Sequence, residues 1–208
     1  MGTVDIVTKE YMRENAIFAA AFNYLIYGGK KVIDPAGLTE IDTATSAVGK
    51  KDALQKYRDV LKAAVIKQDE KMSYVLLGVE NQTDVHYAMP VRNAIYDALQ
   101  YGKQVSDIAA GHRRSQKDYS GKTGGEYLSG FLKEDHIKPV ITLVIHFGAE
   151  EWDGPLSLHE MMSVSDIEIL SFVENYRIHL IDPAKLTEEQ LNKFSTSMRE
   201  VIGYILSL

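Results

Sequence analysis

Stretches of apolar residues with helical or strand spacing alternate along this chain and predict its regular elements. The first stretch, 9–27, is rich in alanine and places Phe18 and Phe22 at helical spacing, so it predicts a helix. We expect Thr8 to cap the start of this helix and Gly28 to end it.

A hairpin of two strands is the next predicted unit. The 30–53 segment before it has the pattern of a loop with at most one short strand. Residues 54–66 fit a helix by propensity but a strand by their neighbours, and residues 73–80 form a continuous β-rich run typical of a strand buried on both faces. Because the link between the two runs is polar and suits a turn, we predict strand, turn, strand.

A helix and a further strand complete the predicted sheet. Pro90 suits the first turn of a helix, and the apolar residues after it keep helical spacing through Val105. Residues 107–135 are polar and predict a long insertion, whereas 138–147 is the clearest strand of the chain. Strand, helix and strand in this order form a crossover, which predicts parallel pairing of 138–147 with 73–80.

The C-terminal part adds elements to this core. Residues 177–181 fit a further strand, and residues 187–206 open with a threonine and two glutamates and then keep amphipathic helical spacing. The sequence therefore predicts an α/β fold in which helices flank one mixed β-sheet. We expect a single domain, 1–208, with a core of about 9–148 and a C-terminal extension of about 149–208.

Composition narrows the classes of protein to which the chain can belong. Of its 208 residues 45% are hydrophobic and none is cysteine, which excludes intrinsic disorder, a disulfide scaffold and a cysteine nucleophile. No apolar run approaches the ~20 residues that span a bilayer, and the N-terminus lacks the apolar core of a signal peptide. We therefore expect a cytoplasmic protein with no membrane partner.

Charge is distributed unevenly along the chain. The overall charge is −6, but residues 50–148 carry 15 basic and 12 acidic side chains, a net of +3, whereas residues 149–208 carry 4 and 11, a net of −7. A basic face can therefore lie on an acidic protein, although a solubilising acidic surface fits the same numbers. The basic segment 112–125 leaves a similar choice between contacts to a DNA backbone and a solvated loop.

Polar residues at the ends of the two hairpin strands are the candidate chemistry of this chain. Glu80 and Gln82 lie two apart and share one strand face, and Asp59 lies on the preceding strand. Carboxylates from adjacent strands, about 5 Å apart, are the hard oxygen ligands that Mg²⁺ prefers. One water on such an ion would attack a phosphodiester, with the Gln82 amide orienting the water or the phosphate. The purely structural alternative is that Glu80 and Gln82 end a strand while Asp59 pairs with a nearby Lys or Arg.

These residues belong to a longer pattern. The chain resembles the recombination-promoting nuclease (Rpn) family, also described as transposases, which is a branch of the PD-(D/E)XK nuclease superfamily. The resemblance rests on Asp59 in a first strand, an apolar second strand that ends in Glu80-Asn81-Gln82, the run Met89-Pro90-Val91-Arg92, and Tyr96 in the next helix, and it continues through 127–131, 139–148 and 151–161.

The resemblance implies a restriction-endonuclease-like core of helix, three strands, helix and strand (αβββαβ). It also implies a metal-dependent DNA endonuclease linked to recombination or mobile elements, with Asp59 and Glu80 as ligands of Mg²⁺ or Mn²⁺ and Gln82 in the place of the superfamily lysine. Such members often add a polar residue from the first helix to the site, which here indicates Asn15, with Glu14 as the second choice. DNA is then the expected partner, and a homodimer would provide the two sites that cutting a duplex requires.

Two residues of the next helix are candidate substrate contacts. Arg92 lies in the first turn after the site strand, where its guanidinium would bind a phosphate or pair with Glu80 or Asp97. Tyr96 lies one turn later on the same face and is expected to position or pack rather than to react. The alternative to an enzyme is a non-catalytic module of the nuclease fold that dimerises or regulates a related protein, which the acidic C-terminal part would suit by mimicking or masking DNA.

Overall fold

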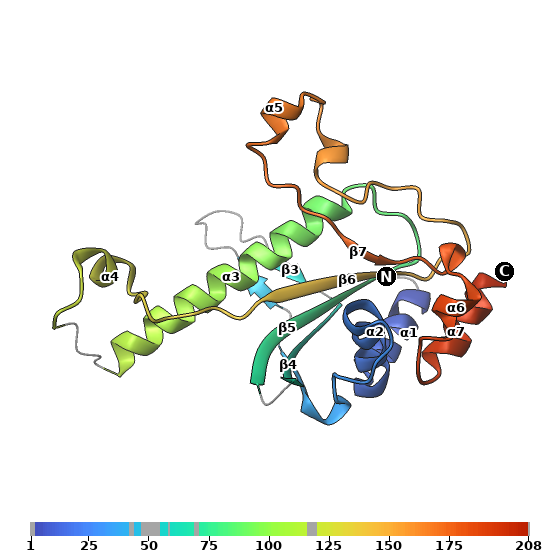
Figure 1. Cartoon of the computed structure of the whole chain (residues 1–208), viewed down its shortest axis with the longest axis horizontal. Helices are drawn as coiled ribbons and strands as arrows, with labels where there is room; N and C mark the ends of the chain where they lie inside the picture. Colours follow the sequence, from blue (N-terminus) through green and yellow to red (C-terminus); the bar gives the residue numbers. More distant parts are fainter. Residues whose placement is uncertain are drawn as a thin grey trace.

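A five-stranded mixed sheet with the strand order β1-β4-β5-β6-β7 organises the chain (Figure 1). The computed structural model describes residues 3–41, 44–46, 55–57, 59–68, 71–115 and 120–207. The strands of the sheet are β1 (Leu38–Glu40), β4 (Val60–Gln68), β5 (Lys71–Gln82), β6 (Val140–His146) and β7 (His179–Ile181), and a separate antiparallel pair joins β2 (Ala44–Ser46) to β3 (Gln55–Tyr57).

Helices lie before, between and after these strands. They are α1 (Thr3–Arg13), α2 (Asn15–Tyr27), α3 (Met89–Arg114), α4 (Gly124–Ser129), α5 (Ile167–Leu170), α6 (Glu188–Leu191) and α7 (Met198–Leu206), with short 3-10 turns at Pro35–Gly37, His159–Met161 and Pro183–Lys185. None of the helices in the described part of the chain combines the length and apolarity that a bilayer span requires.

The hairpin and the crossover form as the sequence predicts. β4 and β5 pair antiparallel, with Val60 opposite Val79 and Gln68 opposite Lys71. β5 then pairs in parallel with β6, and α3 makes the connection between them. The continuous apolar run is explained because helices cover both faces of the sheet, so that residues 75–80 are all buried.

Each face of the sheet has its own core. On one face Phe18 and Phe22 of α2 pack with Leu77, Val79 and Leu143. On the other face Leu61, Leu76 and Val140 pack with Tyr101 of α3. The sheet therefore separates an α1–α2 side from an α3 side, and alternate residues of β4 and β5 point to different partners.

The predicted first helix is two helices rather than one. α1 already begins at Thr3, so Thr8 lies inside it and does not cap it. The chain breaks at Glu14, whose ψ of 123° is extended, and α2 then runs to Tyr27. Gly28 ends α2 as predicted, because its φ of +60° is a left-handed conformation that favours glycine.

Two other boundaries differ from the prediction. The polar insertion begins as helix, because α3 continues to Arg114 before the chain leaves it. The predicted helix 187–206 is divided into α6 and α7, with Thr196 between them at a φ of 67°. Thr187 caps α6 as expected and forms a reciprocal capping box with Gln190.

Candidate functional site

Asp59, the residue just before β4, and Glu80 near the end of β5 come opposite each other when the β4–β5 register is continued by one residue. Val60 pairs with Val79 in the antiparallel register, so the residue before Val60 faces the residue after Val79. Directly opposite residues of an antiparallel pair project to the same face and lie about 5 Å apart. The sequence prediction that these two carboxylates are neighbours thus agrees with the strand register.

Both carboxylates belong to the face that α3 covers. Asp59 is two residues before Leu61, and Glu80 is four residues after Leu76, so alternation gives all four the same side. Leu61 and Leu76 pack in the cluster that includes Tyr101 of α3. α3 therefore packs on the face of the sheet that carries this pair.

Asp59 and Gln82 form the more open part of this site. The half-buried Asp59 accepts a hydrogen bond at Oδ2 from the backbone N–H of Asn81 at 2.8 Å. Gln82 is also half-buried, and its Nε2 donates to the backbone oxygen of Asn81 at 2.8 Å. Its amide oxygen, a hard ligand or a hydrogen-bond acceptor, receives no hydrogen bond from the described residues.

Glu80 is the closed part of the site. Its side chain is 0% exposed, and Nη2 of Arg92 lies 3.1 Å from its Oε2. A carboxylate buried this deeply requires a countercharge, because desolvation of an isolated ion is very costly. Arg92 supplies that charge from the first turn of α3, and its own side chain stays about a third exposed.

Tyr96 holds the guanidinium of Arg92 in place. Nε of Arg92 donates to the Tyr96 hydroxyl at 3.0 Å, and the guanidinium carbon lies 5.6 Å from the ring centroid. Burial by itself would lower the pKa of Arg92, but the nearby Glu80, Tyr96 and Asp59 outweigh it and raise that pKa. Burial and the charge of Glu80 likewise raise the pKa of Tyr96, so its hydroxyl stays protonated.

Asp97 is not the partner of Arg92. One of its oxygens accepts a hydrogen bond from Thr142 of β6 at 2.6 Å, and the other accepts from the hydroxyl of Tyr176. Of the two ion pairs that the sequence left open for Arg92, the structure therefore contains the one with Glu80.

Asn15 lies apart from the Asp59–Glu80 pair, on the α1–α2 side of the sheet. Its Nδ2 donates to the backbone oxygens of Pro35 at 3.0 Å and Leu38 at 3.4 Å, and its Oδ1 accepts from Nζ of Lys62 at 2.5 Å. Lys62 is three residues from Asp59 on the strand and so points to the opposite face. Glu14, the second choice, is exposed at the break between the two helices.

Lys62 is a buried charged residue that the sequence analysis did not single out. It is 1% exposed, and burial lowers its pKa, with a further decrease from Arg13 and an opposing effect of Glu40. The signal for it was a lysine at a core-facing position, between Val60 and Ala64 in the alternation of an apolar strand.

A cleft of about 960 Å³ opens beyond the C-terminal ends of β5 and β6. Gln82 and His146 are the last paired residues of these strands, and His146 lines the cleft with Tyr87. Four carboxylates also line it: Asp84, Glu150, Glu151 and Asp153. The hydroxyl of Tyr87 donates to Asp153 at 2.9 Å, and this bond raises the pKa of Tyr87. The cleft is therefore acidic and would attract cations rather than phosphate.

The donor set of the site fits Mg²⁺ or Mn²⁺ in its chemistry. Asp59 just before β4 and Glu80 on β5 are carboxylates, Gln82 adds an amide oxygen, and such hard oxygen ligands are those both ions accept. Glu80, however, becomes available only when Arg92 moves away from it. The described residues contain no ready group of three or more His, Cys, Asp or Glu side chains that could hold a metal ion.

No family model, curated protein or solved structure matches this chain.

Proposed function

We propose that this chain is a metal-dependent endonuclease that hydrolyses phosphodiester bonds of DNA, in a setting of recombination or mobile elements. The observation that carries the proposal is that Asp59, just before β4, accepts a hydrogen bond from Asn81 beside Glu80 on β5, and that Arg92 pairs with Glu80. Two carboxylates and a guanidinium are the groups needed to bind a divalent cation and the phosphate next to it.

The order of the elements supports a restriction-endonuclease-like core. Along the chain, the elements of the main sheet and its helices follow in the order α1–α2, then the strands β1, β4 and β5, then the helix α3, then the strand β6. This is the order helix, three strands, helix, strand that the family resemblance implies. The pairing adds an antiparallel hairpin that carries the acidic residues and a parallel β5–β6 pair.

Asp59 and Glu80 would hold the cation, and Gln82 would orient the reactants. A bound Mg²⁺ or Mn²⁺ supplies a water of lowered pKa and offsets the negative charge that develops on the phosphate. Gln82 lies on the same strand face as Glu80, and its amide would direct that water or one phosphate oxygen. Unlike a lysine in the same place, an amide orients without neutralising charge.

Arg92 has two partners in this proposal. In the structure it neutralises Glu80, and a cation bound to Glu80 would release it. The freed guanidinium, still tethered by Tyr96 at 3.0 Å, can then bind the scissile phosphate through two parallel hydrogen bonds. In this proposal Arg92 therefore pairs with Glu80 before the metal ion binds and contacts the substrate phosphate afterwards.

The basic end of α3 is too far away to take part in the chemistry. At a rise of about 1.5 Å per residue, Arg113 lies about 30 Å along the helix from Arg92. It could reach only a part of a duplex that is several base pairs from the cut. The positive charge at the reacting phosphate must therefore come from Arg92 and the cation.

Cleavage of supercoiled plasmid DNA tests the proposal. We expect nicking in Mg²⁺ or Mn²⁺, its loss in EDTA, and a decrease of more than about 100-fold in Asp59→Asn and in Glu80→Gln, because each removes a charged ligand without changing shape. Asp107→Asn is the matched control, since that carboxylate pairs with Lys103 on the exposed side of α3. Wild-type rates in both site variants would contradict the assignment.

The alternative, a non-catalytic interaction module, is favoured by one observation. Glu80 is 0% exposed and already neutralised, as in a buried ion pair that only supports the fold. Titration calorimetry with Mn²⁺ separates the two functions. Binding that is lost in Asp59→Asn supports the enzyme, and the absence of binding at millimolar Mn²⁺ supports the module.

A further inference from the structure

Residues 156–176 leave the body of the molecule as an arm that carries α5, well separated from α4 at the end of α3 (Figure 1). The base of the arm is closed by backbone hydrogen bonds from Leu158 to Tyr176 at 2.8 Å and from Ile178 to Leu156 at 2.9 Å. Higher up, a ring nitrogen of His159 bonds the backbone oxygen of Val173 at 2.7 Å. The arm is thus held in its projecting position by hydrogen bonds at its base and along its length.

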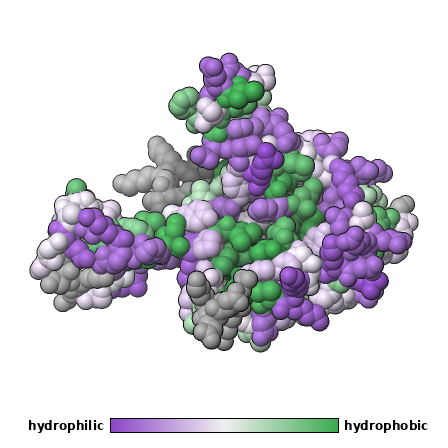
Figure 2. All heavy atoms as spheres, viewed as in Figure 1, coloured by the Kyte–Doolittle hydropathy of each residue, from purple (hydrophilic) through white to green (hydrophobic). Residues whose placement is uncertain are grey.

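The tip of the arm exposes large apolar side chains. Phe172 is 91% exposed and Ile167 83%, and Ile169, Val164 and the two methionines of the arm are exposed as well. Figure 2 shows hydrophobic residues at this tip among hydrophilic ones. A fixed projection that holds several large apolar groups in water is typical of a surface that docks on a partner.

The charge of the arm limits the kind of partner. Residues 156–176 contain four acidic side chains, Glu160, Asp166, Glu168 and Glu174, and neither lysine nor arginine. Glu160 is used within the arm, where it accepts hydrogen bonds from Leu156 and Ser157. Nucleic acid and acidic membranes would be repelled, so the complementary surface is apolar with exposed cations.

The far end of α3, with α4 and the segment after it, presents such a surface; we call residues 109–115 and 120–136 the lobe. Leu128 on α4 is 87% exposed and its neighbour Tyr127 is 71% exposed. Arg113 and Arg114 in the last turn of α3 are exposed and form no ion pair within the described residues. The lobe therefore combines exposed apolar side chains with exposed cationic side chains.

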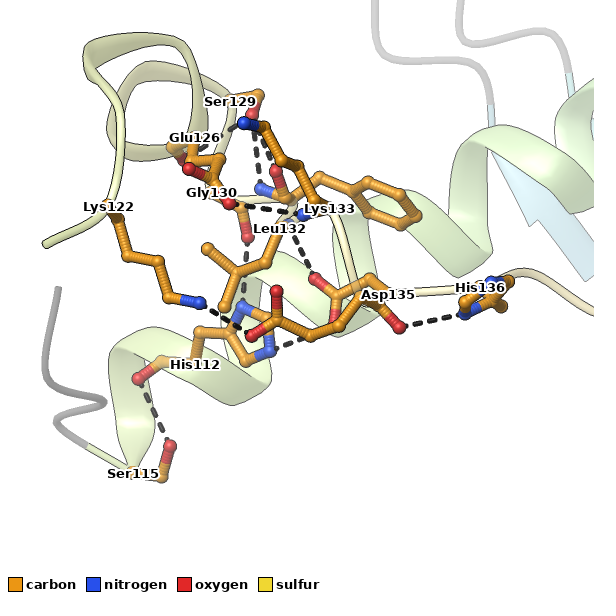
Figure 3. A network of polar contacts seen from close by, with 12 residues as sticks. His112, Ser115, Lys122, Glu126, Ser129, Gly130, Leu132, Lys133, Asp135 and His136 are labelled. Carbon is orange, nitrogen blue, oxygen red and sulfur yellow. Dashed lines mark hydrogen bonds and ion pairs between the residues drawn. The ribbon is translucent and has the colours of Figure 1, made fainter.

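The acidic groups of the lobe are occupied internally (Figure 3). The carboxylate of Glu126 accepts from the backbone and hydroxyl of Thr123 at 2.8 Å and from the N–H of Lys133 at 3.2 Å, and these bonds lower its pKa to about 2. Nε2 of His112 lies 3.3 Å from Oδ1 of Asp135, and Nζ of Lys122 lies 2.8 Å from Oε1 of Glu134. This network occupies the acidic groups of the lobe and leaves Arg113, Arg114 and Lys133 as exposed cations that form no ion pair in the part of the chain that the structure describes.

We propose that the arm of one copy of this chain docks on the lobe of a second copy. The apolar side chains Ile167 and Phe172 would cover Leu128, while the acidic side chain of α5, Glu168, faces the two arginines. Within one chain the arm and the lobe project from separate parts of the molecule, so they cannot meet (Figure 1). Two copies related by a two-fold axis exchange both contacts, which closes the assembly as a dimer. The inference does not depend on the proposed nuclease activity.

The mass in solution, measured by light scattering at micromolar concentration, tests this. We expect a dimer for the wild type and at least a tenfold weaker dimer for Phe172→Ser and for Leu128→Ser. Tyr204→Ser is the matched control, because Tyr204 is another exposed aromatic residue, on α7, and should leave the mass unchanged. A monomeric wild type, or a dimer that Tyr204→Ser weakens equally, overturns the proposal.

Charge reversal makes the test specific for an arm–lobe contact. Glu168→Arg and Arg114→Glu should each weaken the dimer, and the chain with both changes should recover it, because both reciprocal contacts again join opposite charges. An equimolar mixture of Phe172→Ser and Leu128→Ser should dimerise better than either alone, since one contact of the mixed pair is intact. Loss of the dimer only in arm variants would indicate arm–arm contact and overturn the proposal. Lobe variants that weaken DNA binding without changing the mass in solution would also overturn the proposal.

Discussion

Lys62 and Glu80 are buried charged side chains on the same hairpin, and the structure satisfies them in different ways. Lys62 points to the α1–α2 side, where its Nζ donates to the backbone oxygen of Arg13 and to Asn15. Glu80 points to the α3 side, where Arg92 adds a full positive charge at 3.1 Å. Lys62 is bound by neutral groups, whereas Glu80 is balanced by a cation that is itself partly exposed.

This difference distinguishes the contacts of Lys62, which hold the fold together, from the ion pair of Glu80, which a metal ion would replace in the proposed enzyme. The neutral acceptors around Lys62 come from the break between α1 and α2, so the bond ties those helices to β4. The partner of Glu80 lies in the first turn of α3, and in the proposed enzyme a metal ion would replace it. Substitutions of four residues test the comparison, beginning with the one that should have the largest effect.

Arg92→Met should be the most disruptive change, because it leaves Glu80 buried without its countercharge. We expect the metal-free protein to lose about 3 kcal/mol of unfolding free energy, measured by urea denaturation. Millimolar Mn²⁺ should restore part of this loss, since an ion bound to Glu80 takes over the positive charge. Arg92→Lys keeps the charge but loses the planar fork, so its unfolding free energy should lie between those of Arg92→Met and the wild type. A loss that Mn²⁺ does not reduce would mean that Glu80 binds no cation.

Lys62→Met should cost about 2 kcal/mol, because it removes the donor of two partly buried hydrogen bonds. The loss should be the same with and without Mn²⁺, and cleavage per folded molecule should be unchanged. Reduced cleavage at full folding would show that Lys62 takes part in the site after all.

The same variant predicts a dependence on pH. Burial lowers the pKa of Lys62 below its usual 10.5, so between the two values the unfolded chain binds more protons than the folded one. The stability of the wild type relative to Lys62→Met should therefore rise as the pH increases towards 10.5. A difference that stays constant or falls over this range contradicts the prediction.

Glu126→Gln extends the comparison to a buried carboxylate that neutral donors bind. Because Thr123 and Lys133 lower the pKa of Glu126 from 4.5 to about 2, its contribution is present above pH 4.5 and is lost as the pH falls towards 2. Hydrogen exchange of the amides in residues 123–133 should be faster in the variant at neutral pH and equal to the wild type near pH 2. Equal exchange at both pH values would show that the carboxylate is not needed to hold the lobe.

Tyr96→Phe should have the smallest effect, about 1 kcal/mol, because it removes one hydrogen bond to Arg92 and keeps the ring. In the proposed enzyme the change should raise KM for DNA more than it lowers kcat, since Tyr96 positions a phosphate-binding group. A fall in kcat as large as that of Asp59→Asn would instead make the hydroxyl part of the chemistry.

The sequence predicted the sheet better than the helix boundaries. The continuous β-rich run 73–80 and the polar turn before it identified the β4–β5 hairpin, and a strand, helix, strand order was enough for the parallel β6. The break at Glu14 was missed because residues on both sides favour helix locally, and the long-range contacts of Asn15 and Lys62 accompany the break. The last turns of α3 were missed because they are mostly exposed and show no apolar face.

The order of residues by itself determined that Glu80 and Gln82 share one face of a strand, because side-chain direction in a strand follows from counting. The side on which Asp59 lies was decided by the register of β4 against β5. Whether Arg92 pairs with Glu80 or with Asp97 was decided only by the tertiary structure, since both carboxylates are within reach of the same helix turn. Thr142 and Tyr176, from distant parts of the chain, bind Asp97 and leave Glu80 as the partner of Arg92. Such competition among partners far apart in sequence has no local signal, because it depends on which groups the packed sheet and helix bring together.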